Sequence, residues 1–234
     1  MPRRLASTVL LLCLLAAACV PAPAPSSATP AQGAATAVAA FPPAGAKWRV
    51  RVTERGLFRE TIQEVDIQAE PATFDGRTGY GMRTATGTTV LDPASFNTMG
   101  TTANGLVTTR LSPPEGPFFW PLWTGKSWTN AYTASDLVFG QVWTQGHSKA
   151  RVAAFEPVTV PAGTFQAFRI EYSGGIGTSA WGTRDQQGNL GIETEEVHWY
   201  APALKLVVKS TVRRAASHHE GVGLTTIELV RPPG

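Results

Sequence analysis

Three glutamates and a histidine stand close together in this chain and form the first group that could carry chemistry: Glu193, Glu195, Glu196 and His198. Successive side chains of a strand point to opposite faces. Glu193 and Glu195 would therefore share one face, and Glu196 and His198 the other, together with Tyr200. Two carboxylates about 5–10 Å apart across a cleft could hydrolyse a glycoside, and a carboxylate beside an imidazole could make a proton switch. We keep Glu193, Glu195 and His198 as the alternative polar site of a hydrolase, beside the simpler interpretation of a solvated strand face.

Other chemical motifs are weaker. His218, His219 and Glu220 are good metal ligands by type, but adjacent strand residues point apart, and their small and glycine neighbours indicate a turn. His147, after a glycine, also indicates a turn. Neither a nucleophile-elbow serine nor a phosphate-binding Gly-x-x-x-x-Gly-Lys-Ser/Thr occurs. The sequence therefore predicts no metal, no cofactor and no catalytic residue, and favours a protein that is not an enzyme.

Aromatic side chains gather in one short segment that also contains prolines. Residues 118–128 hold Phe118, Phe119, Trp120, Trp123 and Trp128. Proline in this segment disfavours a regular central strand. Such a segment either plugs one end of a sheet or lines a pocket for an apolar ligand. For the second case the candidate ligand-binding residues are Trp120, Trp123, Trp128 and Tyr200.

The N-terminal residues have the pattern of a secretory signal. Arg3 and Arg4 precede an apolar stretch over 5–18, which is shorter than the roughly 20 residues that span a bilayer. The stretch ends in Leu-Ala-Ala-Ala before Cys19, and this ending resembles the lipobox of bacterial lipoproteins. The resemblance implies cleavage before Cys19 and its acylation, palmitate included. It further implies the periplasmic face of the outer membrane, because Val20 is not the aspartate that favours inner-membrane retention. The alternative is an ordinary secretory signal with Cys19 free.

Removal of residues 1–18 would change the composition. Cys13 would leave with the signal and Cys19 would carry lipid, so neither of the 2 cysteines of the chain would serve catalysis or a disulfide. The formal net charge would fall from +3 to +1 with the loss of Arg3 and Arg4. A near-neutral chain has no basic surface for nucleic acid. Residues 19–45, rich in Ala and Pro, are expected to form an extended tether, and 46–234 a single domain.

The sequence of the domain predicts an all-β fold. Alternating apolar and polar residues, rich in β-branched and aromatic types, predict strands. The predicted strands are 48–52, 62–68, 79–85, 106–111, 142–155, 157–160, 164–172, 193–200, 204–212 and 224–230. We expect an antiparallel curved sheet, as a β-sandwich or partial barrel, with at most one short helix. The segments around Gly45/Trp48 and Gly125/Trp128 have similar sequences, which is consistent with a duplicated meander.

Three motifs in the second half resemble those of secreted bacterial domains of unknown function. They are Gly-Lys-x-Trp at 125–128, Val-Pro-Ala-Gly-Thr-Phe at 160–165 and Trp-Tyr-x-Pro at 199–202. The resemblance covers about 120–212. It implies a curved antiparallel sheet related to periplasmic half-barrels, without assigned catalytic residues.

These observations lead to one functional expectation and two alternatives. We expect a membrane-anchored envelope lipoprotein that is a non-catalytic binding or assembly module for an apolar ligand or a protein partner. Its partners would be the membrane, through the lipid anchor, and that ligand or envelope protein, but not nucleic acid. The alternatives are an envelope hydrolase using a Glu/His pair and a purely structural envelope component.

Overall fold

Among the residues that the structure describes, strands are the only regular secondary structure. A computed structural model describes residues 29–56, 58–138, 142–178, 190–216 and 223–234, and these contain no helix. The strands are β1 (Thr36–Ala37), β2 (Lys47–Arg55), β3 (Glu60–Phe74), β4 (Arg77–Arg83), β5 (Thr88–Leu91), β6 (Thr98–Ala103), β7 (Leu106–Glu115), β8 (Leu122–Trp123), β9 (Ser127–Asp136), β10 (Val142–Val160), β11 (Gly163–Thr178), β12 (Leu190–Ala201), β13 (Leu206–Ala216) and β14 (Gly223–Arg231). The expected all-β antiparallel class is confirmed.

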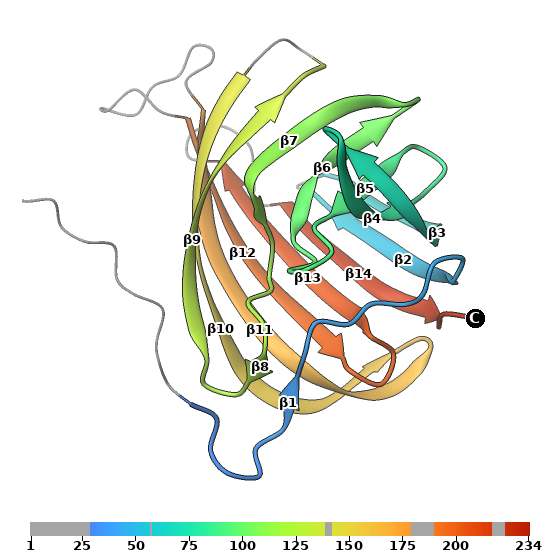
Figure 1. The fold of residues 1–234 in the computed structure, drawn as a ribbon, viewed down its shortest axis with the longest axis vertical. Coiled ribbons are helices and arrows are strands. Elements are labelled where there is room, and N and C mark those ends of the chain that lie inside the picture. Colours follow the sequence, from blue (N-terminus) through green and yellow to red (C-terminus); the bar gives the residue numbers. More distant parts are fainter. Residues whose placement is uncertain (1–28, 57, 139–141, 179–189, 217–222) are drawn as a thin grey trace, which may run out of the picture.

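Twelve of these strands close into a barrel. Each of the strands β2 to β7 and β9 to β14 pairs antiparallel with its neighbour along the chain, and β14 pairs back with β2 (Figure 1). The expected form was a β-sandwich or partial barrel, whereas the sheet closes completely, so it has no edge strand. Strands β1 and β8 form a separate two-stranded piece.

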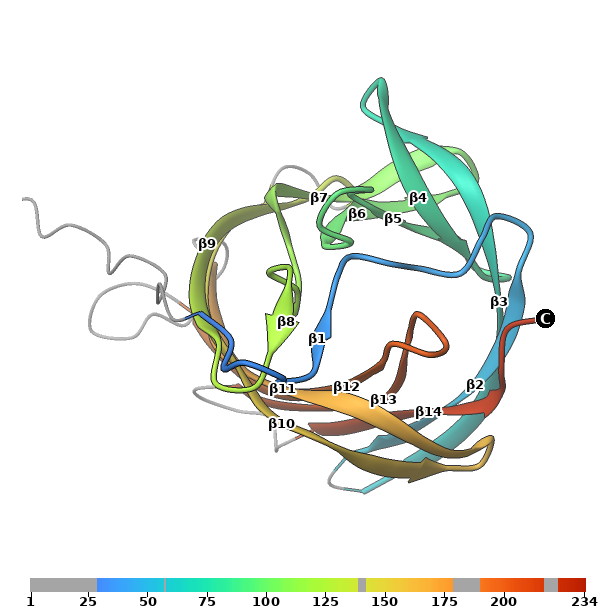
Figure 2. The same cartoon turned by 60° about the horizontal axis from the view of Figure 1, so that its bottom comes forward.

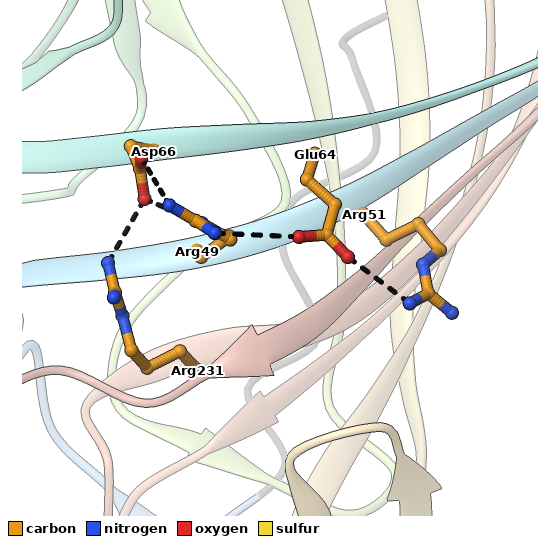
Figure 3. A network of polar contacts seen from close by, with 5 residues as sticks. All are labelled: Arg49, Arg51, Glu64, Asp66 and Arg231. Atoms are coloured by element: carbon orange, nitrogen blue, oxygen red, sulfur yellow. Dashed lines mark hydrogen bonds and ion pairs between the residues drawn. The ribbon is translucent and has the colours of Figure 1, made fainter.

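Alternation along the strands separates an outer and an inner face. In β2, Arg49 binds Asp66 of β3 at 2.8 and 2.7 Å, and Arg51 lies 3.2 Å from Glu64. Arg231 joins Asp66 at 3.1 Å, which completes a surface network (Figure 3). The intervening residues, such as Trp48 and Val50, are buried. In a closed barrel the buried face must point inward, so Trp48 and Val50 and their cross-strand neighbours line the interior.

A segment before β2 crosses one end of the barrel, and we call residues 37–46 the strap. The hydroxyl of Tyr200 in β12 donates to the Ala40 carbonyl at 2.8 Å, and that of Tyr80 in β4 donates to the Pro42 carbonyl at 3.0 Å. Phe41 stacks on Phe96 with ring centroids 4.1 Å apart. The strap thus joins two opposite stretches of the wall (Figure 2). The folded domain therefore begins earlier than the expected tether of 19–45 allows.

The two halves of the barrel begin in the same way. Each has a glycine at positive φ, 90° and 94°, a reciprocal pair of backbone hydrogen bonds to the following strand, and a buried tryptophan three residues on. The corresponding residues are Gly45, Ala46, Ala69 and Trp48 in the first half and Gly125, Lys126, Val152 and Trp128 in the second. This geometry fits the interpretation of two similar six-stranded meanders.

The predicted strands 157–160 and 164–172, which three residues separate in the prediction, pair as a hairpin with a shorter loop. Val158 pairs with Phe165 and Val160 with Gly163, so the turn has two residues instead of the expected three. Gly163 has φ +132°, a conformation that side chains with a Cβ rarely adopt. The amide of Ala162 donates to the Leu229 carbonyl at 3.0 Å, which fastens the hairpin tip to β14.

Candidate functional site

A polar group lies inside the barrel on β12, two strands along the wall from β14. In β12 the Glu196 and His198 side chains share the inner face, and their Oε2 and Nε2 atoms are 2.9 Å apart. Both side chains are largely buried, at 22% and 12% exposed. Alternation placed these two residues on one face of the strand, and the structure joins them.

Glu115 at the end of β7 is coupled electrostatically to Glu196. Burial, and the nearby Glu196 carboxylate, raise the pKa of Glu115 to about 7. Among the described residues no cation pairs with Glu115, and Glu196 has only His198. Burial, followed by Glu115 and Glu196, also raises the pKa of Tyr132 in β9. The charges of Glu115 and Glu196 therefore act on each other and on Tyr132, although the three residues come from three different strands.

Two hydroxyl groups beside these carboxylates have no hydrogen-bond partner. Tyr172 in β11 lies directly opposite Glu196, is 6% exposed, and its phenol oxygen is unbonded. Ser148 in β10 is 3% exposed and its hydroxyl is unbonded as well. A buried polar group left without a partner costs about 1–3 kcal/mol. A water or a ligand that supplies the missing hydrogen bond removes this cost.

Small residues make room for the polar group. A Cβ on Gly146 would lie 2.1 Å from Cζ of Tyr132, so the tyrosine ring lies directly on the glycine. Further along the inner face of β10 and β11, Ser148 pairs with Gly174 and Ala150 with Tyr172. The floor of the polar group is therefore built from residues that have little or no side chain.

An apolar wall continues from the polar group around the barrel. His198 lies opposite Ser210, Ser210 opposite Ile227, and Ile227 opposite Val52. Ile227, Val52 and Val65 are only partly buried although they face inward. A barrel of about eight strands is just wide enough for its own side chains to fill, so twelve strands enclose a wider space. The interior thus offers a polar wall and a partly uncovered apolar wall side by side.

The interior does not present a metal centre. No group of three or more His, Cys, Asp or Glu side chains in the described parts of the chain could hold a metal ion. Within the same residues, no helix is long and apolar enough to cross a membrane. What the arrangement can do is bind, through carboxylates and hydroxyls on one side and apolar side chains on the other.

The predicted aromatic cluster is an end plug. Trp128 is 4% exposed, Trp120 stacks on Phe118 with centroids 4.8 Å apart and meets Tyr200 edge-on, and its indole NH donates to the Ser95 carbonyl at 2.7 Å. Trp123 is partly buried in β8. Trp128 and Tyr200 are therefore buried at the barrel end, and Trp120 packs on Phe118 and Tyr200.

A buried lysine holds the plug together, which sequence reasoning missed. Lys126 is 4% exposed, and its Nζ donates to the carbonyls of Phe119 and Pro121 at 2.5 and 2.7 Å. The ammonium also lies 4.4 Å from the centre of the Trp123 ring. Burial lowers the pKa of Lys126. Its place in the Gly-Lys-x-Trp motif is therefore explained by packing.

The alternative polar site is not assembled. Glu195 is exposed and lies 3.1 Å from Arg213 on the neighbouring strand, and Glu193 is exposed on the same face. His198 points to the other side of β12, so these three residues do not meet. His147, expected in a turn, is an exposed residue of β10. Cys19, His218, His219 and Glu220 lie outside the described residues.

Comparisons with known proteins concern structure alone. No protein-family model matches the chain, and no curated protein is significantly similar to it. A protein described as a lipoprotein of Parabacteroides distasonis is similar over 82% of this chain and 96% of its own, with 13% identity and a TM-score of 0.46. An exported protein with a YmcC-like fold from Bacteroides fragilis is similar over 82% and 97%, with 14% identity and a TM-score of 0.42. The hypothetical lipoprotein YmcC of Escherichia coli is similar over 79% and 84%, with 10% identity and a TM-score of 0.38. Likenesses at this level carry no information on activity.

Proposed function

We propose that this chain is a lipid-anchored envelope protein whose barrel binds an apolar or amphipathic ligand without performing chemistry on it. One observation supports the binding role above the others. Two buried hydroxyls lack partners: that of Tyr172, directly opposite Glu196, and that of Ser148 in β10, opposite Gly174. The inner face continues from Glu196 and His198 into a wall of partly uncovered apolar residues. A ligand that supplied hydrogen bonds to the first group and covered the second would remove both costs.

The proposed anchor is a lipid on Cys19, which directs the protein to the periplasmic face of the outer membrane. The support is the signal pattern at 1–18 and the cysteine that follows it. Intact mass measurement of the protein from its host tests this proposal. We expect a mature N-terminus at Cys19 that carries acyl chains including palmitate, and loss of the chain from the membrane fraction in a Cys19→Ala variant. A wild-type chain that lacks acyl mass would contradict the proposal.

The binding role is tested with an apolar fluorescent dye. N-phenyl-1-naphthylamine added to the full chain with Cys19→Ala, kept free of detergent, should bind saturably. The variant Val52→Phe, which fills the apolar wall, should weaken binding at least tenfold. The matched control is Thr53→Phe, because Thr53 is the next residue and points to the outer face. Equal binding by both variants, or no saturable binding, would contradict the proposed site.

An assembly role for a protein partner is the second candidate. Exposed apolar residues support it, since Phe58 in the turn between β2 and β3 is 98% exposed and Ile62 near the start of β3 is 62% exposed. Copurification of one partner with the wild-type chain, lost on Phe58→Ser, would favour this role over ligand binding.

A further inference from the structure

We infer that the ligand of the barrel is an amphiphile with an ammonium head group, which Glu115 and Glu196 bind while its alkyl tail lies along the apolar wall of Ile227, Val52 and Val65. The inference rests on the proposed binding function and specifies the ligand class at the same site. Its first support is charge. Glu196 points into the barrel with only the His198 imidazole beside it. Glu115 on β7 is coupled to Glu196 electrostatically, and no lysine or arginine of the described residues pairs with either carboxylate.

The hydroxyl groups supply the second, independent observation. Tyr172 is more than nine-tenths buried, lies directly opposite Glu196 on the inner face, and has an unbonded phenol oxygen. An ammonium group has three donors and no acceptor. Carboxylate oxygens and hydroxyl oxygens are acceptors, so the unsatisfied groups on this wall complement such a head group. A carboxylate or phosphate head would instead be repelled by Glu115 and Glu196.

The position of the apolar wall sets the shape of the ligand. From His198, the neighbour of Glu196, the inner face runs across Ser210 and Ile227 to Val52 over three strand spacings. At about 4.8 Å for each spacing this path is about 14 Å long. Its far part is apolar and only partly covered by the protein. A medium-length alkyl chain extending from the head group would lie along this path and bury apolar surface on both sides.

The opposite barrel end is closed and leaves no comparable site. The strap and the plug fill that end with Phe41, Phe118, Trp120 and Tyr200 in mutual ring contact. Lys126, the cation buried there, is already bonded to two carbonyls. Trp128 at this end also has an unbonded indole NH, but that group is a donor and cannot pair with an ammonium group. The unbonded hydroxyl of Tyr172 opposite Glu196 can accept, and it therefore assigns the head group to that part of the interior.

The test compares three probes that share one tail. Decylamine and decanoate, each below its critical micelle concentration, and decanol, below its solubility limit, are titrated calorimetrically at pH 7.5 into the full chain with Cys19→Ala. We expect one saturable site for decylamine, with affinity at least tenfold above that for decanol and no measurable binding of decanoate. Glu115→Gln and Glu196→Gln should each weaken decylamine binding about tenfold or more. Glu64→Gln is the matched control, because Glu64 is a carboxylate of the outer network, and it should leave the affinity unchanged.

The outcomes separate the head group from the binding function. Equal binding of decylamine and decanol, or unchanged affinity in both Glu115→Gln and Glu196→Gln, would overturn the ammonium assignment while the proposed binding function stands. Preference for decanoate would overturn it in the same way. Absence of saturable binding for all three probes, together with no dye binding, would overturn the binding function itself.

Discussion

The Nε2 atom of His198 lies 2.9 Å from the Oε2 atom of Glu196, and both residues point from one strand into the barrel. This contact fixes one carboxylate of the interior, and Glu115 on another strand faces it without a cation of its own among the described residues. Burying these carboxylates lowers the stability of an empty barrel. A bound ligand that paired with them would offset this cost. The expected consequences for stability and binding follow.

The stability of the protein should fall as the pH rises through the range in which Glu115 ionises. The pKa of Glu115 is raised from 4.5 to about 7 by burial and by Glu196. The folded chain therefore binds more protons than the unfolded chain between these values, and stability is lost as the pH rises from about 4.5 to about 7. Over this pH range the free energy of unfolding falls by up to about 3 kcal/mol. The groups facing Glu115 are Glu196 and Tyr132, with His198 behind Glu196.

Urea unfolding of wild type and Glu115→Gln between pH 4.5 and 8 checks this prediction. The variant should become the more stable protein as the pH increases, because glutamine does not ionise. A difference between the two chains that is constant with pH would show that Glu115 titrates normally.

Replacing Gly146 by alanine should displace the Tyr132 ring. The new Cβ would stand 2.1 Å from Cζ of the ring, and overpacking of this kind costs about 1–3 kcal/mol. Thermal unfolding should show a lowered Tm for Gly146→Ala. Gly223→Ala is the control, since nothing lies within 4 Å of a Cβ there. Equal melting temperatures for the two variants would contradict the described contact.

The two tyrosine hydroxyls that hold the strap should stabilise the fold. Tyr200→Phe and Tyr80→Phe each remove one hydrogen bond to a strap carbonyl, and each should lower the free energy of unfolding by about 1 kcal/mol. Tyr172→Phe is the matched control, because its hydroxyl has no partner. In the ligand-free chain that change should be neutral or stabilising. If Tyr172→Phe lowered the free energy of unfolding as much as Tyr200→Phe, the Tyr172 hydroxyl would have a hydrogen bond that the structure lacks.

Lys126 should be essential for the plug in a way that surface lysines are not. Lys126→Met keeps the apolar stem but leaves the Phe119 and Pro121 carbonyls without their donor. We expect a loss of about 2 kcal/mol, measured by urea unfolding. Lys149→Met changes an exposed lysine of β10 and should have little effect. A Lys126→Met variant as stable as wild type would contradict this prediction, because the hydrogen bonds of the ammonium would then only balance the cost of burying it.

Alternation predicted the fold class and part of the site because it reports directly on which face of a strand is buried. It located Glu196 and His198 on one face, and it gave most of the long strands, such as β2, β12 and β14. It missed β5 and β6, since their threonine-rich sequences have almost no apolar alternation, and β9, in which small and polar residues dominate.

The rest of the site depends on contacts that no local pattern records. Glu115 follows two prolines at the end of β7, and only closure of the barrel brings it to Glu196. The strap was expected to be a tether because its Ala and Pro residues have no periodicity, whereas tertiary hydrogen bonds from Tyr80 and Tyr200 hold it. The sequence identified the aromatic segment 118–128. Whether its rings form a plug or a pocket depends on which distant parts of the chain pack over them, and no local pattern reports this.

Native mass spectrometry of the full chain with Cys19→Ala, purified from its own host without detergent, tests the binding function most directly. We expect a reproducible extra mass of one amphiphile, which dissociates in the gas phase and is lost or reduced in Glu115→Gln. A wild-type chain at its bare polypeptide mass, under conditions that preserve the fold, would contradict the account and favour a purely structural envelope protein.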